Sequence, residues 1–69
     1  MDIATKIKVA CTMRGISVSE LARRVGTTPQ NMSGRLKVGK FTGEELEKIA
    51  QALDCKVELF FEFSDGTKV

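Results

Sequence analysis

The sequence contains no histidine, tryptophan or tyrosine, and it has only one proline and two cysteines. Without histidine, the chain cannot supply a histidine general base or a histidine-containing nucleophilic triad. The cysteines, Cys11 and Cys55, lie far apart within apolar patterns, so we expect small buried hydrophobes rather than zinc ligands. These absences indicate that the protein is not an enzyme and that it uses no metal or small-molecule cofactor.

Long hydrophobic runs are also missing. No apolar stretch approaches the ~18 residues that span a membrane, and the N-terminus shows no signal-peptide pattern. Two scattered cysteines suit a reducing compartment, so we expect a cytoplasmic protein with no membrane partner. The chain has 69 residues, of which 42% are hydrophobic and 29% charged, which is the composition of one globular domain. Its core must be small, so oligomerisation would help to stabilise it.

Charge of one sign is concentrated in the middle of the chain, although the net charge is only +2. Residues 14–40 contain six basic residues and one acid, a net charge of +5. Residues 41–54 contain four acids and one lysine, a net charge of −3. A basic segment of this kind is typical of a surface that binds a polyanion, and the alternative is an ordinary solvated face.

Capping signals and apolar periodicity predict a mainly α fold of four or five helices. Helices are expected to begin after Asp2, Ser17, Thr28 and Thr42, because each of these residues can accept a backbone N–H of the first turn. Ser17 and Thr42 open S-x-x-E and T-x-x-E sequences, which have the spacing of a capping box. Pro29 suits the first position of the third helix, where a missing N–H is harmless.

After Asp54 the apolar period changes from 3.6 to 2. Every odd position of CKVELFFEF, residues 55–63, is apolar, and an Asp-Gly turn follows. The pattern predicts a β-strand with a short hairpin. Too few residues follow the turn to pair with the whole strand, so we expect it to pair with the same strand of a second copy. The alternative is an edge strand that covers the helices of one monomer. The predicted dimer interface consists of Val57, Leu59, Phe60 and Phe61.

Residues 15–37, GISVSELARRVGTTPQNMSGRLK, have the spacing of a helix-turn-helix. Ala22 leaves room where two short helices cross, and Gly26 tolerates the positive φ of a tight turn. The segment resembles the helix-turn-helix of the lambda-repressor/Cro-like (Xre-like) transcriptional regulators, and the resemblance covers roughly residues 3–53. It implies a lambda-repressor-like DNA-binding domain whose recognition helix, about residues 29–37, enters the major groove. The C-terminal segment resembles a strand appended to this domain in small regulators.

The resemblance also implies roles for single residues. Gln30 and Asn31 fall where the family reads base edges; both can make paired hydrogen bonds to adenine, and Arg35 could make them to guanine. Two positions depart from the family. Thr27 stands where valine is usual, and Arg35 stands near a position that is often apolar. The turn and packing residues are Ala22, Gly26 and Met32, and the expected DNA-backbone contacts are Thr28, Ser33, Lys37 and Lys40.

The sequence therefore predicts a transcriptional regulator, a repressor, that binds double-stranded DNA as a homodimer. Residues 1–54 would form the helix-turn-helix domain, and residues 55–69 would form its dimerisation element. Two alternatives use the C-terminal strand to hold another protein. One is a DNA-binding antitoxin, and the other is an interaction adaptor that does not bind DNA.

Overall fold

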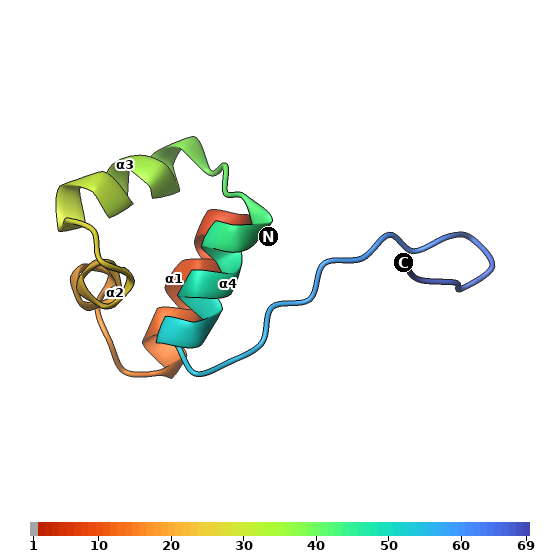
Figure 1. The fold of residues 1–69 in the computed structure, drawn as a ribbon, viewed down its shortest axis with the longest axis horizontal. Coiled ribbons are helices and arrows are strands. Elements are labelled where there is room, and N and C mark those ends of the chain that lie inside the picture. Colours follow the sequence, from red (N-terminus) through yellow and green to blue (C-terminus); the bar gives the residue numbers. More distant parts are fainter. Residues whose placement is uncertain (1) are drawn as a thin grey trace.

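The computed structural model describes residues 2–69, which form four helices followed by a C-terminal arm, residues 55–69 (Figure 1). Each helix begins at the N-cap that the sequence predicts, because a side-chain oxygen of that residue accepts a backbone N–H three residues later. This confirms the mainly α class, with four helices in the described residues. The helices are α1 (Ile3–Met13), α2 (Val18–Val25), α3 (Pro29–Val38) and α4 (Gly43–Ala52).

The two predicted capping boxes have different outcomes. At the start of α4, Thr42 accepts the N–H of Glu45, and the Glu45 carboxylate accepts the N–H of Thr42, both at 3.1 Å, so the box is complete. At the start of α2, Ser17 accepts the N–H of Glu20 at 3.0 Å, but the return bond is not formed among the described residues. The Glu20 carboxylate instead accepts hydrogen bonds from Arg23 and Arg24 on the same helix. Local ion pairing therefore replaces half of the predicted box.

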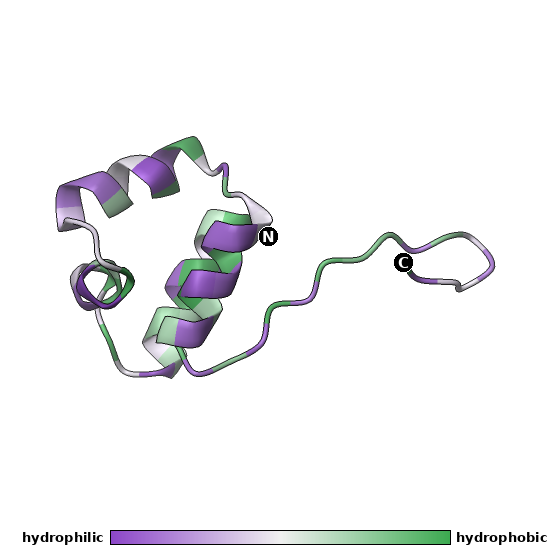
Figure 2. Cartoon of the chain, viewed as in Figure 1, coloured by the Kyte–Doolittle hydropathy of each residue, from purple (hydrophilic) through white to green (hydrophobic). Residues whose placement is uncertain are grey.

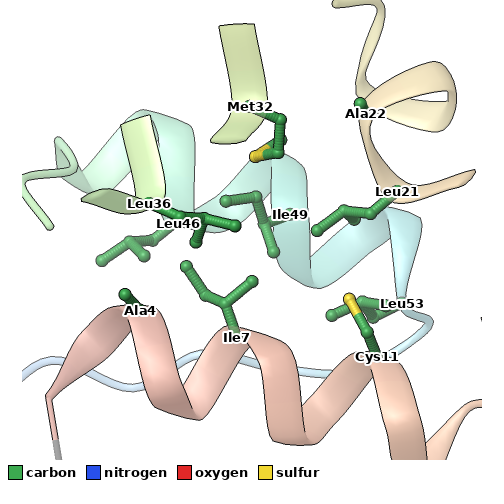
Figure 3. Close-up of a cluster of buried hydrophobic side chains, with 10 residues drawn as sticks. All are labelled: Ala4, Ile7, Cys11, Leu21, Ala22, Met32, Leu36, Leu46, Ile49 and Leu53. Carbon is green, nitrogen blue, oxygen red and sulfur yellow. The ribbon is translucent and has the colours of Figure 1, made fainter. Parts of the chain in front are cut away.

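One buried cluster joins all four helices (Figure 3). The inward side chains of α1 face those of α4, and α2 and α3 close the cluster from the other side (Figures 1 and 3). Leu21, a member of this cluster, is 0% exposed. Cys11 is buried as predicted, and its burial raises the pKa of the thiol; the same prediction is wrong for Cys55, which is exposed. The cluster consists of Ala4, Ile7, Cys11, Leu21, Ala22, Met32, Leu36, Leu46, Ile49 and Leu53.

Two arginines hold the C-terminal end of α4. Arg14, just after α1, donates from Nε to the carbonyl oxygen of Leu53 and from Nη2 to that of Asp54, both at 2.7 Å. Arg24 on α2 donates to the carbonyl oxygen of Ala52 at 3.2 Å. These carbonyls lack partners within the helix, and the helix dipole makes them favourable sites for a cation. The arm therefore leaves the helical body from a point fixed by α1 and α2.

The predicted β-strand at residues 55–63 is not formed in the described chain. The arm runs away from the helices, with apolar and polar residues along it, and turns back near its end (Figures 1 and 2). Its one bridge joins Glu62 and Lys68, where Phe61 and Val69 exchange backbone hydrogen bonds and the N–H of Phe63 donates to Thr67 at 2.7 Å. The short hairpin exists, but the backbone of residues 56–60 makes no hydrogen bond within residues 2–69. A strand needs a neighbouring backbone to pair with, which explains why the alternating pattern alone does not produce one.

Candidate nucleic-acid interface

The turn between α2 and α3 has the geometry that a helix-turn-helix requires. Ala22 is 0% exposed, so its small side chain sits where the helices pack together. Gly26 ends α2 with φ of 84°, and the N–H of Thr27 donates to the carbonyl oxygen of Ala22 at 2.9 Å. A side chain at this φ would be strained, which accounts for glycine. The sequence identified both residues in these roles.

Two buried side chains fix the rotation of α3 about its axis. Met32 and Leu36 lie four residues apart and both point into the core (Figure 3). The opposite side of the helix is therefore exposed. Gln30, Ser33 and Lys37 lie on exposed positions of α3, and within residues 2–69 their side chains make no intramolecular hydrogen bond. These three predicted contact residues are available to an external partner.

The N-terminus of α3 is built by Thr27, Thr28, Pro29 and Asn31. The hydroxyl of Thr28 accepts the N–H of Asn31 at 3.1 Å, and Pro29 occupies the first turn. The Asn31 amide Nδ2 donates to the hydroxyl of Thr27 at 2.7 Å. Thr28 and Asn31 are exposed, so the positive end of the helix dipole faces solvent beside two hydroxyls and an amide. Thr27 thus holds the side chain of Asn31, a role that the sequence reading did not assign to it.

Arg35 differs from the other predicted base contacts because the protein itself engages its guanidinium. Nη2 donates to the carbonyl oxygen of Lys40 at 2.9 Å and forms an ion pair with Glu45. The guanidinium also lies over the ring of Phe41, 5.3 Å from its centroid. Arg35 therefore connects α3 to the start of α4, through partners five to ten residues away along the chain that the sequence did not link to it.

Several other basic residues of the middle segment are likewise engaged. Glu20 pairs with both Arg23 and Arg24, and these hydrogen bonds lower the pKa of the Glu20 carboxyl. Arg14 is bound to the end of α4. Spacings of three and four residues on α2 could have revealed the Glu20 pairs from sequence. Of the six basic residues counted in residues 14–40, Arg14, Lys37 and Lys40 make no ion pair in the described chain, and Arg14 is instead occupied by backbone carbonyls.

The Glu45 carboxylate is also drawn into this network. Its hydrogen bond with the backbone of Thr42 and then the hydrogen bond with Arg35 lower the pKa of its carboxyl. The complete capping box and the Arg35 ion pair thus share one carboxylate. The end of α3 and the start of α4 are held together through it.

The predicted dimer residues are found in two environments. Val57 is half-buried and packs against the core cluster. Leu59, Phe60 and Phe61 are 66%, 50% and 77% exposed. Phe60 carries the ammonium group of Lys68 over its ring, 4.7 Å from the centroid. The arm therefore presents large apolar side chains to solvent.

Within residues 2–69, no helix is sufficiently long and apolar to cross a membrane. The same residues contain no group of three or more acidic or cysteine side chains placed to hold a metal ion.

Comparison with known proteins gave one match. A family model described as a Cro/C1-type HTH DNA-binding domain matches residues 6–66. No match was found among curated proteins or among solved structures. The matched range includes the helix-turn-helix and most of the C-terminal arm.

Proposed function

The chain belongs to the Cro/C1-type HTH DNA-binding domain family, and we propose that it is a repressor that reads a specific DNA sequence with α3. The domain supports a role as a DNA-binding transcription regulator. The observation that carries the proposal is the division of α3 into two sides. Met32 and Leu36 are buried, while Gln30, Ser33 and Lys37 are exposed on a helix that follows a tight turn. This leaves polar side chains for the major groove.

Gln30 and Asn31 are the proposed base-reading residues. The Gln30 side chain makes no hydrogen bond within residues 2–69, so its amide can present a donor and an acceptor to adenine. The Asn31 amide is already oriented by Thr27, and it can keep that bond or exchange it when a base approaches. Arg35 stays a predicted base contact, although it would have to leave Glu45 and the Lys40 carbonyl to reach guanine.

Phosphate contacts are proposed for Thr28, the N-cap of α3, for Ser33 within α3, and for Lys37 and Lys40 near its end. Thr28 lies at the helix N-terminus, where backbone N–H groups and the helix dipole favour an anion. The two lysines make no ion pair in the described residues and are exposed. Such contacts position the protein and make binding sensitive to salt, but they do not select a sequence.

We also propose that the protein acts as a homodimer, with residues 1–54 binding DNA and residues 55–69 joining the two copies. The arm exposes Leu59, Phe60 and Phe61, and the backbone of residues 56–60 makes no hydrogen bond in the described chain. A second copy would satisfy both features. Two recognition helices could then read half-sites about 34 Å apart, one helical turn of DNA.

Selection of bound sequences from random duplex DNA is the direct test. A two-fold symmetric consensus is expected, and binding should weaken strongly between about 50 and about 200 mM salt. An adaptor that does not bind DNA would give no enriched sequence and no salt-sensitive binding, and this result would overturn the proposal.

A matched pair of glutamine variants tests the recognition helix. Gln30→Ala should weaken binding to the selected sequence by about 1–3 kcal/mol. Gln51→Ala removes the same side chain from an exposed position on α4, outside the helix-turn-helix, and should leave affinity unchanged. Equal affinities of the two variants would contradict the assignment of Gln30, and the same comparison applies to Asn31→Ala.

The exposed arm also fits the second candidate, an antitoxin whose arm holds another protein. Sedimentation of the isolated protein separates the two. A dimer that Phe60→Asp converts towards monomer supports pairing between copies. A wild-type protein that stays monomeric at all concentrations would favour a different partner.

A further inference from the structure

The hairpin at the end of the arm determines which backbone edge remains open. In an extended chain, the N–H and C=O groups of alternate residues point to opposite edges. Phe61 and Phe63 bond to the returning residues Val69 and Thr67, so their edge is occupied beyond residue 60. The other edge carries the backbone groups of Lys56, Glu58, Phe60 and Glu62, which make no backbone hydrogen bond in residues 2–69. This edge is open along the whole length of residues 55–63.

From this edge we infer the register of the arm pairing between two copies, an inference that rests on the proposed homodimer. Residue 55 of one copy lies opposite residue 63 of the other, and Leu59 meets Leu59 of the second copy on the two-fold axis. All nine residues of the segment then take part. Pairing along the edge of Phe61 and Phe63 would be limited to the first five residues, because the hairpin blocks the rest.

The charged face selects this register over its neighbours. With Leu59 on the axis, Lys56 of each copy lies opposite Glu62 of the other, which makes two pairs of opposite charge. Moving the axis to Phe60 places Glu58 opposite Glu62 twice. Moving the axis to Glu58 places Glu58 of one copy opposite Glu58 of the other. Like charges directly opposite each other destabilise an antiparallel pair, and opposite charges stabilise it.

The apolar face fits the same arrangement but does not select it. Val57 of one copy lies opposite Phe61 of the other, and Cys55 lies opposite Phe63. Val57 already packs against the core cluster, so Phe61 of the second copy is brought beside the helical body. Within one copy, Nζ of Lys68 lies 3.9 Å from Oε1 of Glu62. In the paired arms, these two side chains and Lys56 of the second copy would form a row whose charges alternate in sign.

A single cysteine substitution tests the register, because Cys55 is exposed and reduced in the native chain. In Phe63→Cys, the new thiol faces Cys55 of the other copy in a non-hydrogen-bonded pair, with Cα atoms about 4.5 Å apart. This separation lies within the range of a disulfide. Mild oxidation should give a covalent dimer on a non-reducing gel. The double variant Phe63→Cys/Cys55→Ser should give none, since its two new thiols lie about 26 Å apart along the paired strands.

A second set of variants distinguishes failure of the register from failure of the dimer. In the Cys55→Ser background, Leu59→Cys should cross-link, whereas Phe60→Cys should not. Cross-linking of Phe60→Cys alone, in a protein that sediments as a dimer, would overturn the register and leave the homodimer intact. A protein that sediments as a monomer would overturn both.

The charge pairs provide a measurement that needs no disulfide. Lys56→Glu places glutamate opposite Glu62 twice and should raise the dimer dissociation constant several-fold. Lys48→Glu makes the same charge change on the exposed surface of α4 and should leave that constant unchanged. Equal dissociation constants for the two variants would contradict the inferred register.

Discussion

Replacing Arg14 by alanine removes the two hydrogen bonds that hold the end of α4. Nε and Nη2 donate to the carbonyl oxygens of Leu53 and Asp54 at 2.7 Å, and the first of these bonds is partly buried. A hydrogen bond from a charged donor contributes about 1.5–3 kcal/mol when buried, and an exposed one contributes less. A cation at a helix C-terminus adds about 0.3–1 kcal/mol. Ordering the long side chain opposes these terms by up to about 2 kcal/mol.

The expected net loss is therefore about 2 kcal/mol in the free energy of unfolding. A domain of this length has a total of about 3–10 kcal/mol, so the loss is a large fraction of its stability. For domains of 60–100 residues, each 1 kcal/mol shifts Tm by about 4–8 °C, which predicts a fall of about 8–16 °C.

Urea unfolding followed by far-ultraviolet circular dichroism measures this change. Wild type and variants must be compared at one protein concentration, because the proposed dimerisation would contribute to apparent stability. Arg23→Ala is the matched control, since it removes the same side chain and charge from α2, where the Arg23 side chain is 75% exposed. If Arg14→Ala unfolds at the same urea concentration as Arg23→Ala, the clamp on α4 contributes no more than the exposed ion pair of Arg23 with Glu20, and the reasoning fails.

Three further predictions concern the interior, the cap and the carboxylates. Met32→Ala should lower stability by about 2–5 kcal/mol because Met32 is 4% exposed, whereas Met32→Leu should lower it by less than about 1.5 kcal/mol in the same urea assay. Thr28→Ala should lower the free energy of unfolding by about 1 kcal/mol, because it removes the cap of α3, whereas Thr28→Ser should keep most of that stabilisation. Equal losses in the two variants would show that the capping hydroxyl is unimportant. Hydrogen bonds from Arg23 and Arg24 lower the folded-state pKa of the Glu20 carboxyl from 4.5. The stabilisation that these contacts give is therefore present above pH 4.5 and is lost as the pH falls through the folded-state pKa. Glu20→Gln should therefore lower the urea midpoint at neutral pH and show a smaller fall than wild type on acidification; identical pH profiles would contradict this.

Local features of the sequence predicted most of the helical part of the fold. The N-caps at Asp2, Ser17, Thr28 and Thr42 depend on atoms three residues apart, and all four are confirmed. The division of α3 into a buried and an exposed side also followed from spacing, because Met32 and Leu36 lie one helical turn apart. Short-range rules are sufficient where both partners lie in one segment.

Contacts between segments could not be read in this way. The clamp joins Arg14 to carbonyls 39 and 40 residues later, and backbone carbonyls carry no sequence signal. The engagement of Arg35 by Glu45 depends on the path between α3 and α4. As a result, the count of basic residues predicted a more available positive surface than the structure presents.

The C-terminal pattern shows a different limit. Alternating apolar residues in residues 55–63 describe two faces of an extended segment, but a strand also needs hydrogen bonds from a neighbour. Within residues 2–69 that neighbour reaches only the last few residues. The sequence predicted the turn, but the predicted strand with one buried face is wrong for the single chain, in which Leu59, Phe61 and Phe63 are exposed.

The buried cluster lies between Ala4 and Leu53, so the arm contributes none of its members in the described chain. Residues beyond Val57 are exposed and can change without creating a cavity in the interior. If the arms pair as proposed, partner choice and folding are encoded in separate parts of the chain. After a gene duplication, an exchange of Lys56 and Glu62 in one copy would then separate the two descendants into distinct assemblies, while each kept the same interior and the same proposed recognition helix.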